Sequence, residues 1–111
     1  MPAFEALRRK ADFDALARSG TARSNRLLVL RSLRTNRPAT RVGMSTPRTL
    51  GGAVQRNRVR RRLRELVRER RDAIGAGWDL LLIARPEAAK ASHAELRVAL
   101  GSLLERSEVG V

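Results

Sequence analysis

The chain has 111 residues, of which 42% are hydrophobic and 32% charged, and its formal net charge is +13. This length predicts one domain with a modest core, and the charge indicates a polyanionic partner. There is no cysteine, which excludes disulfides and thiolate metal sites, and the longest apolar run, LLLIA, is far too short to span a membrane.

The first half of the chain predicts a helix followed by strands. Apolar residues at helical spacing favour a helix over 11–18 that ends near Gly20. We expect an edge strand at 21–24, a strand at 26–34 and another at 41–45. We also expect 1–10 and 107–111 to be loose ends of a single domain over 1–111, because neither segment carries a clear pattern.

The second half predicts two helices around a buried strand. Gly51 and Gly52 precede a helix expected at 53–72, and a strand at 78–86 is apolar on both faces. The motif Ser92–Glu95 fits a capping box, so a last helix should run to about 106. The order α–β–β–β–α–β–α predicts an α+β fold, a small two-layer sandwich of helices on a sheet.

The helix at 53–72 concentrates positive charge. Nine arginines and two glutamates lie between Arg56 and Arg71, and the first two turns hold no acidic residue. This opposes the preference of a helix N-terminus for negative side chains, so we expect an external anion to relieve the repulsion. A solvated face would mix signs, whereas here only Glu65 and Glu69 can pair with the helix's own arginines. The pattern therefore favours phosphate binding by guanidinium groups and exposed N–H groups.

The composition alone leaves the polyanion open. A ribosomal-type structural RNA binder and a DNA-compacting protein would carry similar charge. Single-stranded RNA is usually held on aromatic side chains, and the chain offers only Phe4, Phe13 and Trp78. Phe13 fits a core position as well as a stacking one, whereas Trp78 opens the buried strand and is expected to pack.

The residues argue against a protein-based active site. His93 is the one histidine, and the eleven carboxylates are scattered along the chain. Nuclease chemistry with two metals needs clustered carboxylates, which are absent here. Asp79 opens a strand and is expected to hydrogen-bond locally or pair with an arginine. We therefore predict no catalytic residue and no metal ligand among the side chains.

The sequence VGMSTPRTLGGAVQ followed by RNRVRRRLRE, residues 42–65, resembles the R-N-R region of the protein subunit of bacterial ribonuclease P. The likeness extends over about 11–106 and includes DF at 12–13, Gly20 and GWDLLLIAR at 77–85. It implies a mixed central sheet with a left-handed βαβ crossover. It also implies a small basic protein that binds a catalytic RNA and promotes removal of the 5′ leader of precursor tRNA.

The resemblance also implies two sets of binding residues. Those expected to bind the RNA subunit are Arg48, Arg56, Asn57, Arg58, Arg60, Arg61, Arg62 and Arg64. Those expected to line a cleft for the precursor-tRNA leader are Phe13, Ala17, Val29 and Arg31. Many family members have aromatic residues at the positions of Ala17 and Arg31, which leaves Phe13 as the stacking residue here.

The same resemblance sets the expected partners. They are the catalytic RNA subunit of ribonuclease P and precursor tRNA. Mg²⁺ would be held mainly by the RNA and by no protein side chain. We expect a cytoplasmic protein that is monomeric when free and has no membrane partner.

Overall fold

The computed structural model of the chain describes residues 4–109. Its helices and strands are β1 (Glu5–Ala6), α1 (Lys10–Ser19), β2 (Thr21–Ser24), β3 (Leu28–Arg34), β4 (Arg41–Ser45), α2 (Ala53–Glu69), β5 (Trp78–Ala84) and α3 (His93–Arg106). Short 3-10 turns cover Arg48–Leu50, Arg71–Ala73 and Pro86–Lys90. Every expected helix and strand is present, and the expected bounds differ from these by a few residues at most. The sequence did not predict β1 or the 3-10 turns.

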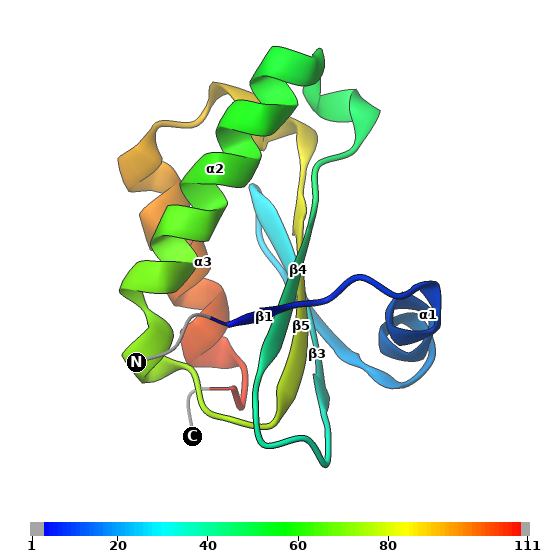
Figure 1. Cartoon of the computed structure of the whole chain (residues 1–111). Coiled ribbons are helices and arrows are strands. Elements are labelled where there is room, and N and C mark those ends of the chain that lie inside the picture. Colours follow the sequence, from blue (N-terminus) through cyan, green and yellow to red (C-terminus); the bar gives the residue numbers. More distant parts are fainter. Residues whose placement is uncertain (1–3, 110–111) are drawn as a thin grey trace.

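The five strands form one mixed sheet in the order β1-β4-β5-β3-β2. β4 pairs in parallel with β1 and with β5, whereas β5 pairs antiparallel with β3. In Figure 1 both β4 and β5 run upward, β4 is nearer the viewer, and α2 connects them on the left of the sheet. Seen from the helix side, β5 therefore lies to the left of β4. This is the left-handed crossover that the resemblance implied, against the usual right-handed rule.

Helices cover the sheet unequally. α2 and α3 pack on one face, and α1 lies alone on the other (Figure 1). β5 is buried on both sides, as its sequence predicted. Leu80 and Leu82 join the main core under α2 and α3, whereas Leu81 joins a small cluster with Leu7 and Leu16 under α1. α1 thus adds a partial third layer to the two-layer sandwich.

The described part of each chain end makes hydrogen bonds to the domain and buries one apolar side chain. β1 pairs with β4, and the Leu7 N–H donates to the Val42 carbonyl at 3.1 Å. The Leu7 side chain is buried. Val109 is buried too, and its carbonyl accepts from the Gly75 N–H at 2.8 Å. Within the expected loose ends, Leu7 and Val109 are therefore packed and Lys10 begins α1, while residues 1–3 and 110–111 lie outside the described residues.

The predicted capping box at the start of α3 is confirmed. The Ser92 hydroxyl accepts from the Glu95 N–H at 3.1 Å, and the Glu95 carboxylate accepts from the Ser92 N–H at 2.9 Å. These bonds satisfy two N–H groups that a helix start leaves without partners. The Ser92 N–H bond is the main reason that the pKa of Glu95 is lowered.

Candidate nucleic-acid interface

One narrow stripe fixes α2 on the sheet. The stripe consists of Val59, Leu63, Leu66 and Val67, and all four side chains are buried in the main core. Their spacing places them on one side of the helix. Every other position on α2 therefore faces solvent or the edges of the helix contact, which is where the arginines lie.

Five residues make an exposed row along the outer side of α2, which we call the cationic ridge. Its members are Asn57, Arg58, Arg61, Arg64 and Arg68. No ridge arginine has an ion-pair partner within 4.0 Å among residues 4–109. Arg68 was not among the predicted site residues, although its position one helical turn after Arg64 places it on the same side. The ridge offers free guanidinium donors to an external anion.

Two other predicted contact residues, Arg60 and Arg62, are already engaged within the protein. Arg60 donates to the Asn57 side chain at 3.0 Å and to the Thr46 hydroxyl. Arg62 donates to the Ala91 carbonyl at 3.3 Å, across the contact between α2 and the segment before α3. Arg56 is half-buried, and its Nε has no hydrogen-bond partner among the described residues. Arg60 and Arg62 therefore contribute to the fold as well as to the surface charge.

Glu69 does not pair with the arginines of its own helix, as the sequence suggested it could. It accepts two hydrogen bonds from Arg97 of α3, at 3.1 and 3.2 Å. This exposed pair lowers the pKa of Glu69 and raises that of Arg97. The sequence could not reveal the pairing because the two residues are 28 positions apart. Its consequence is that an acidic side chain points away from the ridge.

The N-terminus of α2 is open. Gly52 is the N-cap residue and supplies no side-chain hydrogen bond, and the first turn contains no acidic residue. Gly51 has a φ of 134°, a conformation that residues with a Cβ rarely adopt. Arg48 is exposed on the 3-10 turn just before it. Free N–H groups, the positive end of the helix dipole and Arg48 therefore lie at one end of the cationic ridge.

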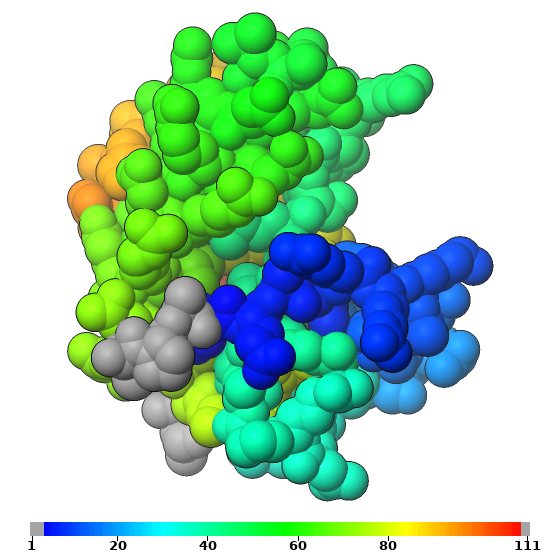
Figure 2. Space-filling model, viewed as in Figure 1, coloured from blue at the N-terminus to red at the C-terminus, as the bar shows by residue number. Residues whose placement is uncertain are grey.

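The four predicted cleft residues lie on the opposite face of the sheet from α2. Phe13 and Ala17 are on α1, and Phe13 packs against the Leu7–Leu16–Leu81 cluster. Val29 and Arg31 are on β3, half-buried, on the side that α1 covers only in part. Figure 2 shows a hollow between the blue α1 segment and the green segment that leads into α2. The structure thus brings the four residues to one face.

A glycine lets α1 approach the sheet closely. A Cβ built on Gly43 of β4 would lie 3.2 Å from Cε1 of Phe13 and 3.2 Å from Cβ of Leu7. Both distances are shorter than comfortable carbon contacts. The position of the Phe13 ring therefore depends on the absence of a side chain at this point of β4.

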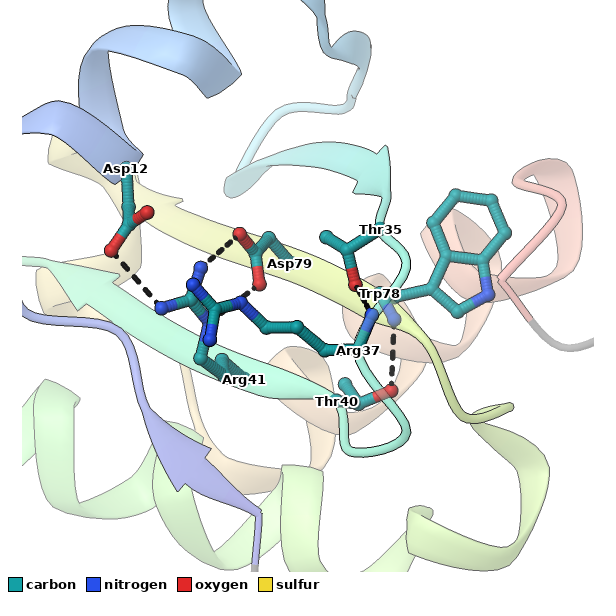
Figure 3. Close-up of polar contacts among 7 residues, drawn as sticks. All are labelled: Asp12, Thr35, Arg37, Thr40, Arg41, Trp78 and Asp79. Atoms are coloured by element: carbon teal, nitrogen blue, oxygen red, sulfur yellow. Dashed lines mark hydrogen bonds and ion pairs between the residues drawn. The ribbon is translucent and has the colours of Figure 1, made fainter.

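A buried ion network ties α1 to the same part of the sheet (Figure 3). Arg41 of β4 donates to both carboxylate oxygens of Asp79, at 2.8 and 2.6 Å, and to Asp12 of α1 at 3.1 Å. The hydrogen bond with Asp79 is the main cause of a raised pKa for Arg41. The expected arginine partner of Asp79 is confirmed, but nothing in the sequence distinguished Arg41 from the other arginines.

Among residues 4–109, no three His, Cys, Asp or Glu side chains are grouped so that they could hold a metal ion. Within the same range, no helix has the length and apolar character needed to cross a membrane.

The fold and these surfaces define a class, namely small basic α+β proteins that present an arginine-rich helix on one face of the sheet. The family model described as Ribonuclease P matches residues 1–108. The ribonuclease P protein component of Acidothermus cellulolyticus is 42% identical over 108 residues, which are 96% of this chain and 90% of the relative. The ribonuclease P protein component of Desulforapulum autotrophicum is 35% identical over 105 residues, which are 95% of this chain and 90% of the relative.

Solved structures agree with the sequence comparison. The ribonuclease P protein of Staphylococcus aureus is similar with a TM-score of 0.88 and 26% identity, covering 96% of this chain and 97% of that one. The ribonuclease P protein of Thermotoga maritima is similar with a TM-score of 0.85 and 28% identity. The match covers 94% of this chain and 98% of that one. The chain belongs to the ribonuclease P protein family. Membership implies an RNA-binding role in tRNA processing, as part of a ribonucleoprotein endoribonuclease.

Proposed function

We propose that this chain binds the catalytic RNA of ribonuclease P through the cationic ridge and the open N-terminus of α2. The observation that carries the proposal is that the ridge arginines have no ion partner among residues 4–109, in a chain whose family works with RNA. Several guanidinium groups at one-turn spacing match the repeat of phosphates along a backbone better than they match a single anion. Arg48 extends the same surface beyond the helix.

We further propose that the α1 side of the sheet contacts the 5′ leader of precursor tRNA. Phe13 offers a partly exposed ring, Val29 an apolar floor, and Arg31 a cation for a base or phosphate. This surface and the cationic ridge lie on opposite faces of one sheet (Figure 1). One domain would in this way hold the RNA subunit on one side and the leader on the other.

In this proposal the protein supplies positioning and charge neutralisation, and the RNA carries out hydrolysis of the leader. Mg²⁺ would be held mainly by the RNA. The free protein would act as one copy and bring no catalytic group of its own. These roles accord with a surface rich in arginine.

The test is Mg²⁺-dependent cleavage of a precursor tRNA by a bacterial ribonuclease P RNA, with and without this chain, at near-physiological salt. We expect faster leader removal with the chain, and loss of the gain in Arg58→Gln/Arg61→Gln. The matched control is Arg26→Gln/Arg37→Gln, which removes two exposed arginines outside both surfaces. If the wild-type chain binds the RNA and leaves cleavage unchanged, a structural, ribosomal-type RNA binder replaces the proposal.

A further inference from the structure

A cavity of about 330 Å³ lies between β1 and α2, on the helical face of the sheet. Its apolar lining comes from Phe4, Val42, Met44 and Val67. Arg64, Arg68 and Arg71 line it as well. Figure 2 shows the N-terminal segment, in blue, beside the green surface of α2. We call this cavity the β1–α2 pocket.

The charge in the pocket is unbalanced. Three guanidinium groups face one carboxylate, that of Glu5, and none of the three forms an ion pair among residues 4–109. The Nε of Arg71 is shielded from solvent and has no hydrogen-bond partner within the same range. A shielded donor without an acceptor is uncommon, because its lost hydration is not replaced. An anion in the pocket would supply the missing acceptor.

The lining suits a molecule with a flat apolar part and an anionic part. A phenyl ring and a thioether favour contact with a heteroaromatic face, while guanidinium groups bind phosphate with two parallel hydrogen bonds. The volume lies within the usual range for small-ligand sites, about 300–1,000 Å³. A nucleotide carries both parts, and the pocket adjoins the cationic ridge through Arg64 and Arg68.

We propose that the β1–α2 pocket binds one unpaired nucleotide of the RNA subunit, with its base on the apolar floor and its phosphate on the arginines. This inference rests on the proposed function, and it adds a base-binding site to a surface otherwise suited to phosphates. The site is separate from the proposed leader cleft. Alternate residues of β4 face opposite sides of the sheet, so Val42 and Met44 face the pocket whereas Gly43 faces Phe13.

The first experiment titrates the full-length, isotopically labelled chain with adenosine 5′-monophosphate and follows backbone amide signals by NMR. We expect saturable shifts at Ala6, Met44 and Val67. Ribose 5-phosphate, which lacks the base, and adenosine, which lacks the phosphate, should each bind about tenfold more weakly. Equal binding of the nucleotide and ribose 5-phosphate would overturn the proposal, as would shifts that depend on protein concentration alone and so indicate a second copy of the chain in the pocket.

Variants separate the two halves of the pocket. Phe4→Ala should weaken nucleotide binding about tenfold and leave ribose 5-phosphate binding unchanged. Arg68→Gln/Arg71→Gln should weaken both, whereas the control Arg26→Gln/Arg37→Gln should weaken neither beyond a small general effect of charge. The same spectra report whether each variant is folded. No effect of either pocket variant would contradict the site.

A second readout uses the ribonuclease P RNA itself. Phe4→Ala should lower affinity for the RNA at every salt concentration and leave the log–log salt slope unchanged, because no phosphate contact is removed. If the wild-type chain accelerates leader removal while Phe4→Ala binds the RNA normally, the pocket inference fails and the proposed function stands. If adenosine monophosphate binds in the pocket while the wild-type chain has no effect on cleavage, the proposed function fails instead.

Discussion

At the scale of single residues, Arg41 is a little-exposed charge with two carboxylate partners. It is shared by two carboxylates from different elements, and its side chain is 11% exposed, against 5% for Asp79 and 19% for Asp12. Buried charges cost solvation free energy that only well-made partners offset. The network therefore positions α1 on the sheet more by specifying one geometry than by adding stability.

Replacing Arg41 tests this directly. Arg41→Met leaves Asp79 buried without a partner, and we expect the free energy of unfolding to fall by about 3 kcal/mol, measured by urea denaturation. Arg41→Met/Asp79→Leu should recover most of that loss, because an apolar pair can replace a buried ion pair at little cost. A double variant as unstable as the single one would contradict the interpretation that an unpaired charge causes the loss.

Gly43 gives a second prediction at this scale. In Gly43→Ala the new methyl group must displace Phe13 or Leu7, so α1 shifts away from β4. We expect weaker binding of precursor tRNA to the assembled complex and unchanged binding of mature tRNA, measured as two dissociation constants. Affinity for the ribonuclease P RNA serves as the control, since the cationic ridge is on the other face. Equal losses for both tRNAs would indicate a folding defect.

At the scale of elements, all the arginines of α2 except Arg56 fall into two groups. Those of the ridge are exposed and unpaired among residues 4–109, whereas Arg60 and Arg62 donate hydrogen bonds within the protein. The repulsion between the ridge arginines is tolerated because the buried stripe and contacts with α3 hold the helix in place. Only the exposed set is free to exchange solvent and counterions for phosphate.

This division predicts different salt dependences. Arg58→Gln and Arg61→Gln should each reduce the log–log salt slope of RNA binding by about 0.7–0.9, because each removes one phosphate contact. Arg62→Gln should change the slope less and lower the thermal midpoint, because its guanidinium group holds the Ala91 carbonyl. Filter binding across a salt series provides the slopes. A full-sized change for Arg62 would place it in the RNA contact instead.

The cap of α3 predicts a pH effect. Hydrogen bonds from Ser92 lower the pKa of Glu95 in the folded state. A lowered carboxyl pKa means that the contribution to stability is present above the unfolded value, 4.5, and is lost as pH falls through the folded value. Glu95→Gln should therefore show a smaller loss of urea midpoint than the wild type on acidification below about pH 5. Parallel pH profiles would argue against a role for this carboxylate.

At the scale of the whole molecule, the net charge of +13 opposes folding unless anions bind. We expect sulfate to raise the thermal midpoint above that in chloride at equal ionic strength. The fluorescence of Trp78 is a suitable probe of unfolding, because its side chain is only 5% exposed. Cζ of Arg34 lies 4.5 Å from the centroid of its ring. In Arg58→Gln/Arg61→Gln the difference in thermal midpoint between sulfate and chloride should be smaller than in the wild type. Equal midpoints for the wild type in both salts would count against a defined anion site.

Most of the architecture could be predicted from local sequence patterns. The periodicity of α2, the capping box of α3 and the two-sided burial of β5 each depend on residues close in sequence, so they could be predicted. β1 could not, because two residues show no periodicity and their pairing with β4 depends on a distant partner. The handedness of the crossover came from the resemblance, since no local pattern encodes it.

The candidate site, too, could be predicted only where its features depend on residues close in sequence. Arginines at the start of α2 oppose the preference of a helix N-terminus for negative side chains, and this conflict predicted the cationic ridge. The prediction was possible because charge and helical spacing can both be read from neighbouring residues. The bond from Arg62 to Ala91, the pairing of Glu69 with Arg97 and the Arg41 network depend on contacts across 28 or more positions, so sequence reasoning could not separate structural arginines from free ones. The β1–α2 pocket could not be predicted, because β1 forms one of its walls and was itself not predictable.

The order of the strands has a consequence for synthesis on the ribosome. β5 is the last strand among residues 4–109, yet it lies in the centre of the sheet, between β4 and β3. Before Ala84 has emerged from the exit tunnel, the β1–β4 pair and the β2–β3 hairpin lack the strand that joins them. The nascent chain therefore exposes apolar strand surface until β5 has emerged and can join the two pairs. Until β5 is in place, encounters with RNA involve an arginine-rich segment that is not yet fixed on its sheet.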